Sequence, residues 1–140
     1  MTTRLFLLSA AVFAAIVLLG NAAKADIGAY AYVTKVPPPA SVDAASPQIY
    51  EVDLNAQQLT SPGPLAVRIL TSANVSAVYV HVEGQTFGIP LAESGQFQLA
   101  VTLPALPSYM KGRNYQFDFE ALTNDGKRTH VAVPVFITGS

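Results

Sequence analysis

The chain has 140 residues, half of them apolar, with a formal net charge of −1 and no cysteine. This length and composition predict one domain with a substantial apolar core. Its eight basic residues are too scattered to form a stripe that follows phosphates, which argues against nucleic acid as a partner. The lack of cysteine excludes a disulfide framework and thiolate metal sites.

Residues 1–25 have the pattern of an export signal. Arg4 gives a short positive start, residues 5–19 form an uncharged apolar run, and Ala23-Lys24-Ala25 places small residues at the two positions that define cleavage. The alternative is a retained membrane anchor, but the run is shorter than the roughly 20 residues that a span needs. We therefore predict cleavage before Asp26, export to the periplasm or the extracellular space, and no membrane insertion afterwards.

Cleavage would also change the charge of the chain. Of the eight basic residues, Arg4 and Lys24 lie in the signal, so six remain against nine acidic ones. An acidic mature chain makes anionic lipid an unfavourable partner.

Residues 26–46 are interpreted as a proline-rich arm ahead of a domain of residues 47–140. Tyr30 and Tyr32 precede Pro37-Pro38-Pro39, and three consecutive prolines remove backbone donors and stiffen the chain as polyproline II. The segment with the tyrosines has three possible states: an edge strand, a segment packed onto the domain, or a mobile terminus. The sequence does not choose among them.

Alternating apolar and polar side chains predict a series of short strands from residue 47 onward. In the first, Tyr50, Val52 and Leu54 are expected on the buried face, with Glu51 and Asp53 on the wet face. Four more are expected over residues 65–69, 75–82, 85–91 and 97–103. Alternate valines should form the core face of residues 75–82, and the core face of residues 97–103 should consist of Phe97, Leu99, Val101 and Leu103. Glycine and proline interruptions make residues 85–91 an edge strand.

The clearest pattern is a hairpin over residues 115–137. Odd-numbered positions are apolar in both halves, so they are expected in the core, whereas Gln116, Asp118, Glu120 and His130 are expected to be exposed. Asn124-Asp125-Gly126 between the halves suits a three-residue loop in which the glycine has a positive φ. This loop would place Glu120 directly opposite His130.

About seven short strands at this spacing predict an all-β sandwich. The order of the Gly84 turn, the strand of residues 97–103, Leu103-Pro104, Gly112 and Tyr115-x-Phe117-x-Phe119 resembles bacterial immunoglobulin-like and fibronectin type III-like domains over about residues 47–138. The resemblance implies an immunoglobulin-like antiparallel β-sandwich with a tyrosine corner at Tyr115, whose hydroxyl would bind backbone in the preceding loop. It implies little about function, because this scaffold hosts many unrelated roles.

One exposed sheet face is the candidate site. In an immunoglobulin-like sheet the strand of residues 75–82 lies beside the first strand of the hairpin, so one face would collect Tyr79, His81, Asp118, Glu120 and His130. We interpret this face as a contact surface for a protein partner. The alternative is an ordinary solvated sheet face that has weak cross-strand pairs and no binding role.

Enzymatic function is not predicted. The chain has no Gly-x-Ser-x-Gly, no cysteine nucleophile and no histidine within a recognisable motif, and no catalytic residue, metal ligand or cofactor is assigned. The prediction is an exported, non-catalytic binding or structural module at the cell envelope. Two alternatives stay open: a small metal-handling or hydrolytic protein that uses His81, Glu120 and His130, and an assembly subunit that donates its N-terminal arm to a partner.

Overall fold

The computed structural model describes residues 30–38 and 44–139, and this part of the chain is almost entirely β-structure. The predicted signal, its cleavage site and the start of the mature chain lie outside the described residues. No helix in the described part is long and apolar enough to cross a membrane. One 3₁₀ turn, η1 (Ser108–Met110), accompanies the strands β1 (Tyr32–Lys35), β2 (Ile49–Leu54), β3 (Gln58–Ser61), β4 (Gly63–Thr71), β5 (Val75–Val82), β6 (Gln85–Ile89), β7 (Leu91–Glu93), β8 (Gln96–Leu103), β9 (Arg113–Thr123) and β10 (Arg128–Gly139).

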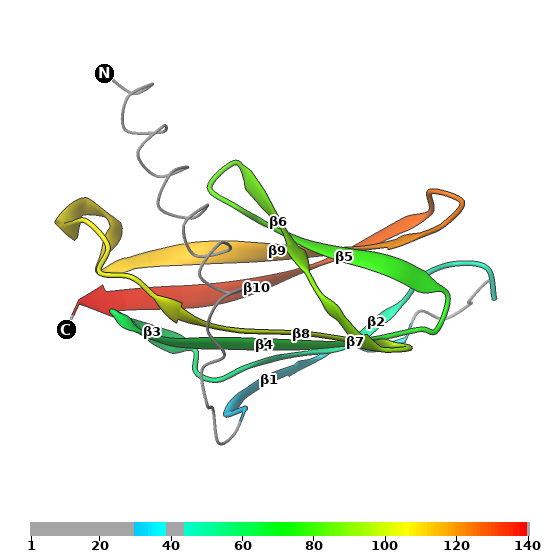
Figure 1. Ribbon diagram of the computed structural model, residues 1–140, viewed down its shortest axis with the longest axis horizontal. Coiled ribbons are helices and arrows are strands. Elements are labelled where there is room, and N and C mark those ends of the chain that lie inside the picture. Colours follow the sequence, from blue (N-terminus) through cyan, green and yellow to red (C-terminus); the bar gives the residue numbers. More distant parts are fainter. Residues whose placement is uncertain (1–29, 39–43, 140) are drawn as a thin grey trace.

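The strands form two five-stranded sheets stacked face to face (Figure 1). The first sheet has the order β1-β2-β4-β8-β7, and the second has the order β3-β10-β9-β5-β6. The predicted all-β sandwich is therefore confirmed. In the first sheet β2, β4, β8 and β7 take the order of strands A, B, E and D of an immunoglobulin domain, and in the second β5, β9 and β10 take the order of C, F and G.

All seven expected strands are present, and β6 is an edge strand as predicted. The structure adds β1, β3 and β7, which are only three or four residues long. Such segments show too few alternations for a pattern to emerge from the sequence. The chain changes sheets after β2, so that β3 lies parallel to β10 before β4 returns to the first sheet.

The core lies between the sheets and follows the predicted alternation closely. In β9, Tyr115, Phe117, Phe119 and Ala121 are buried, and in β5 the alternate valines are buried as expected. Leu99 and Val131 were expected in the core and are partly buried against it. The odd-numbered residues of β10 complete this face, since Val133, Val135 and Ile137 are almost fully buried.

The turn between β9 and β10 has the predicted geometry. Gly126 has a φ of 88°, and the amide of Thr123 donates to the carbonyl of Lys127 at 3.0 Å. The Thr123 hydroxyl donates to the Asp125 carboxylate and lowers the pKa of that group below its usual value. The loop thus sets the register of the hairpin, and Glu120 lies opposite His130 as expected.

The prediction for β2 was partly wrong. Val52 and Leu54 are buried, but Tyr50 is exposed and Asp53 is completely buried. An irregularity in the pairing with β4 between Ile49 and Glu51 turns Ile49, rather than Tyr50, toward the core. A regular alternation cannot reveal such a bulge.

Asp53 is buried on the outer side of the first sheet because other groups cover it. The Arg68 guanidinium donates to Asp53 Oδ2 from Nε at 2.9 Å and from a terminal nitrogen at 2.8 Å. The ring of Tyr30 lies 4.5 Å from the centre of that guanidinium. The pairing with Arg68 makes a carboxylate tolerable in this position through Oδ2, whereas Oδ1 has no hydrogen-bond partner among the described residues.

Part of the predicted arm is an edge strand. Residues Tyr32–Lys35 form β1 and pair antiparallel with β2 of the same chain. The Tyr32 hydroxyl also donates to the carbonyl of Pro134 in the second sheet at 3.2 Å. Of the three states considered for this segment, the structure shows the edge strand, and it is used within its own chain.

The tyrosine corner is present as the resemblance implied. The Tyr115 hydroxyl donates to the carbonyl of Met110 at 2.7 Å, and both residues are buried. Burial raises the pKa of the Tyr115 phenol above its usual value. This bond ties the start of β9 to η1, the connection that carries the chain from the first sheet to the second.

We expect Tyr115→Phe to lower the free energy of unfolding by about 1–3 kcal/mol, because it leaves the buried Met110 carbonyl without its donor. Tyr109→Phe is the matched control, since Tyr109 lies in η1 but is exposed, and it should change stability by less than about 0.5 kcal/mol. Urea melts of both variants measure the difference. Equal effects would show that the corner bond does not stabilise the fold.

Candidate functional site

The five residues predicted to share a face do so in the structure, and we call this set the polar face. Glu120 in β9 lies opposite Tyr79 in β5 on one side and His130 in β10 on the other. His81 lies opposite Asp118. All five side chains therefore come from three neighbouring strands of the second sheet, on its outer surface. Their role as a contact surface stays a prediction.

Glu120 is the centre of the polar face, and the expectation that it is exposed was wrong. Its side chain is only 9% accessible, although it projects away from the core. Side chains from both flanking strands lie over its carboxylate. An alternation pattern predicts which way a side chain points, but not how much the side chains of neighbouring strands cover it.

Three cationic or titratable groups surround the Glu120 carboxylate. His81 Nε2 lies 3.3 Å from Oε1, whereas His130 Nε2 lies 3.2 Å from Oε2. A terminal nitrogen of Arg128 lies 3.6 Å from Oε2. The carboxylate thus bridges the two histidines, which are separated by a strand, and holds both rings in place.

Sequence reasoning missed Arg128, although a signal for it existed. Arg128 precedes His130 by two positions on β10, and residues two apart on a strand share a face. The ring of His130 is held on its other side as well, since its Nδ1 lies 3.4 Å from Asp118 Oδ2. Both ring nitrogens of His130 therefore face a carboxylate oxygen, one from Asp118 and one from Glu120.

Thr86 is a second member that the sequence did not indicate. It lies on β6 opposite His81, and its Oγ1 is 2.7 Å from His81 Nδ1. If the threonine hydroxyl donates to Nδ1, then Nε2 carries the proton that points at Glu120. The result is a chain of hydroxyl, imidazole and carboxylate across three strands. The register of β6 is set by the two-residue turn Glu83-Gly84, in which both residues have a positive φ and which places Val82 opposite Gln85 and His81 opposite Thr86.

Tyr79 forms the boundary between the polar face and a shallow groove. Its side chain is exposed, and its ring lies close to Gly88, where an added Cβ would be 3.9 Å from the ring. The groove has a volume of about 270 Å³, and the exposed Leu91 of β7 also borders it. Its lining residues are Ser76, Ala77, Val78, Tyr79, Gly88, Ile89, Pro90, Leu91 and Phe97.

His81, Glu120 and His130 are the residues that the metal-handling alternative would use as ligands. Within residues 30–38 and 44–139, no group of three histidine, aspartate or glutamate side chains is arranged to hold a metal ion. The two imidazoles approach different oxygens of Glu120 from opposite sides.

No protein-family model matches the chain, and no curated protein matches it in sequence. A solved protein of the DUF4785 family from Legionella pneumophila is similar in structure, with a TM-score of 0.50 and 17% identity over 63% of this chain and 28% of that protein. SGBP-B of the mixed-linkage glucan utilization locus of Bacteroides ovatus, solved with a mixed-linkage heptasaccharide, matches with a TM-score of 0.33 and 14% identity over 60% of this chain and 22% of its own.

The similarity to the DUF4785 protein supports a β-sandwich and nothing finer. The chain spans less than a third of either protein. At this level of identity the first similarity concerns the fold alone, and the second is too weak to indicate what this chain binds. No specific immunoglobulin or fibronectin type III family is shown.

We expect Glu120→Gln to lower the free energy of unfolding by about 1.5–3 kcal/mol, because hydrogen bonds to a charged group are lost in a covered position. Asp118→Asn is the matched control on the same strand and face. Its side chain is 40% accessible, so its loss should cost less than about 1 kcal/mol. Urea melts at neutral pH compare the two.

A double-mutant cycle between Glu120 and His130 tests the bridge itself. The coupling should exceed about 0.5 kcal/mol if the two groups stabilise each other. Equal effects of the two single carboxylate variants, together with no coupling, would show that the cluster does not hold the histidines.

Proposed function

We propose that this chain is an exported, non-catalytic, immunoglobulin-like binding module that contacts a protein partner at the cell envelope through the polar face. Export is supported by the charged start, apolar run and small cleavage-site residues within residues 1–25. The fold alone is neutral on function, so the proposal depends on the arrangement of the face.

The bridging Glu120 carboxylate is the observation that carries the proposal. It lies under His81 and His130 and keeps both rings in fixed positions at the surface. Side chains that are already ordered lose less conformational freedom when a partner binds. An ordinary solvated sheet face would not need a carboxylate that is 9% accessible between two imidazoles.

The surroundings of the polar face have the composition of a protein interface. The exposed Tyr79 and Leu91 border an open groove beside the polar face, and Arg128 lies at the opposite margin of the face. Tyrosine and arginine are frequent anchors of protein interfaces.

A hydrolytic function is the second candidate, and the Thr86–His81–Glu120 chain is the observation that favours it. In such a reaction His81 would take the proton of the Thr86 hydroxyl, and Glu120 would stabilise the resulting imidazolium. Two facts favour binding instead. The chain of groups lies on an open strand surface, and the groove beside it is lined by Tyr79 and not by Thr86.

We expect a photo-crosslinking amino acid at Tyr79 to yield a discrete adduct with another protein in the native cell envelope. Tyr109 and Tyr50 are matched control positions, because both are exposed tyrosines that lie away from the polar face. Adducts are detected by gel shift and identified by mass spectrometry. His81→Ala combined with His130→Ala should abolish the Tyr79 adduct, because these rings form the adjoining surface.

Similar adducts from all three positions, or none from Tyr79, would contradict the proposed contact surface. Hydrolysis of p-nitrophenyl acetate provides the test of the second candidate. Turnover that disappears in both Thr86→Val and His81→Ala would replace the binding proposal by an enzymatic one. A background rate that neither variant changes would reject it.

A further inference from the structure

The two lateral edges of the sandwich differ in how far the chain covers them. On one side β1 extends the first sheet, and its Tyr32 hydroxyl reaches the Pro134 carbonyl of the second sheet. On the other side the first sheet ends at β7 and the second at β6. Because β7 has three residues and pairs with β8 only at Phe97 and Gln96, most of β8 lies beyond its reach.

Among the described residues, no strand pairs with Leu99–Leu103 on the side of β8 that faces away from β4. The hydrogen bonds of the neighbouring residues show which backbone amides and carbonyls point to this side. The Gln98 amide donates to the Pro90 carbonyl, so the backbone groups of Gln98 point away from β4. Residues two apart on a strand point the same way, hence Ala100 and Thr102 also direct their amides and carbonyls to the open side.

The hydrogen bonds of β4 independently show that the backbone groups of Ala100 and Thr102 point away from β4. Ala66 and Pro64 of β4 lie opposite Ala100 and Thr102. Ala66 exchanges hydrogen bonds with Asn55 on its other side, and the Pro64 carbonyl accepts from the Asn55 side chain. The amides and carbonyls of Ala100 and Thr102 therefore have no partner strand among the described residues.

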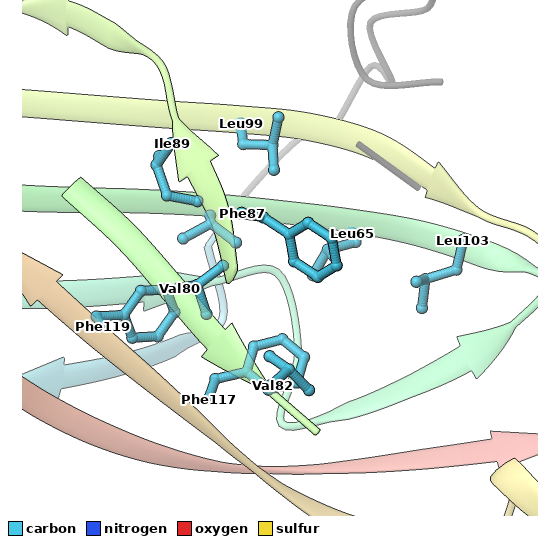
Figure 2. Close-up of a pocket in the computed structure, with 10 residues that line it drawn as sticks. Leu65, Val80, Val82, Phe87, Ile89, Leu99, Leu103, Phe117 and Phe119 are labelled. Carbon is cyan, nitrogen blue, oxygen red and sulfur yellow. The ribbon is translucent and has the colours of Figure 1, made fainter. Parts of the chain in front are cut away.

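An apolar cavity lies directly inside this edge. It holds about 30 Å³, and no polar atom lines it. Figure 2 shows Phe87 and Ile89 of β6 on one side of the cavity and Leu99 and Leu103 of β8 on another. The free backbone edge and the apolar interior thus adjoin each other.

The edge lacks the protection that natural sheets normally carry. Neither Gln96–Leu103 nor Gln85–Ile89 contains a charged residue or a proline. Exposed edge strands usually carry lysine, proline or a bulge that prevents pairing with another chain. Two copies of an uncharged edge meet no electrostatic repulsion.

We propose that the Leu99–Leu103 edge pairs antiparallel with the same edge of a second copy of this chain, around a two-fold axis at Val101. In this register Ala100 of each copy faces Thr102 of the other, and each free amide meets a free carbonyl. The pairing ends where it must, since Pro104 lacks an amide and the Gln98 amide is already bound to Pro90. This interface is separate from the polar face.

The test is the mass of the full chain in solution, measured by sedimentation equilibrium from micromolar to millimolar concentration. We expect association toward twice the chain mass as concentration rises. Thr102→Lys should weaken it at least tenfold by adding a charge to each copy at the edge. Gln116→Lys, an equally exposed change on the outer face of the second sheet, should leave it unchanged.

Ala100→Pro provides a second variant, because it removes an amide that makes no bond to the described part of the chain. It should also abolish association, while circular dichroism confirms that it folds. Amide hydrogen exchange identifies the occupant: Ala100 and Thr102 should become protected as concentration rises. A single-chain mass at every concentration, undiminished association of Thr102→Lys, or protection independent of concentration would each overturn the proposal.

Discussion

The register of β9 is the constraint on which the rest of the structure depends. Its inward residues Tyr115, Phe117 and Phe119 carry the largest side chains on the inner face of the second sheet. A shift by one residue would turn these rings to solvent and bury their polar neighbours, so the aromatic positions define the register uniquely. Because β9 lies between β5 and β10, it also determines which outer residues meet across the sheet.

The polar face follows from this register. Phe119 must point inward, so Glu120 must point outward, and the pairings with β5 and β10 then bring His81 and His130 to its carboxylate from opposite sides. A covered carboxylate is unfavourable unless charged or hydrogen-bonding partners surround it. Here the partners are both histidines and Arg128. The cost of covering Glu120 is offset by contacts that order the surface, and an ordered surface is suited to recognition.

The chain covers the two lateral edges of the sandwich to different extents. The segment before the prolines covers one edge through β1, and Tyr30 and Arg68 cover the buried Asp53 on the outer surface of the first sheet. Among the described residues the opposite edge has only the short β7, which leaves the outward backbone groups of Ala100 and Thr102 in β8 without a partner strand next to an apolar cavity. The chain therefore closes one side of the sandwich with its own strand β1. The other side remains available for a further strand, because unpaired backbone groups favour a hydrogen-bonding partner.

Some features of this protein were determined by the sequence alone. Aromatic and β-branched residues at alternate positions define the hairpin, the valine face of β5 and the all-β class, since the period of a strand is local. The Asn124-Asp125-Gly126 loop defines the hairpin register, and with it the pairing of Glu120 with His130. Other features were decided only by the tertiary structure. The bulge that exposes Tyr50 and the cover over Asp53 and Glu120 depend on where separate strands meet. The alternation within one strand indicates the direction of a side chain, whereas its burial and its partners come from strands that the local pattern does not place.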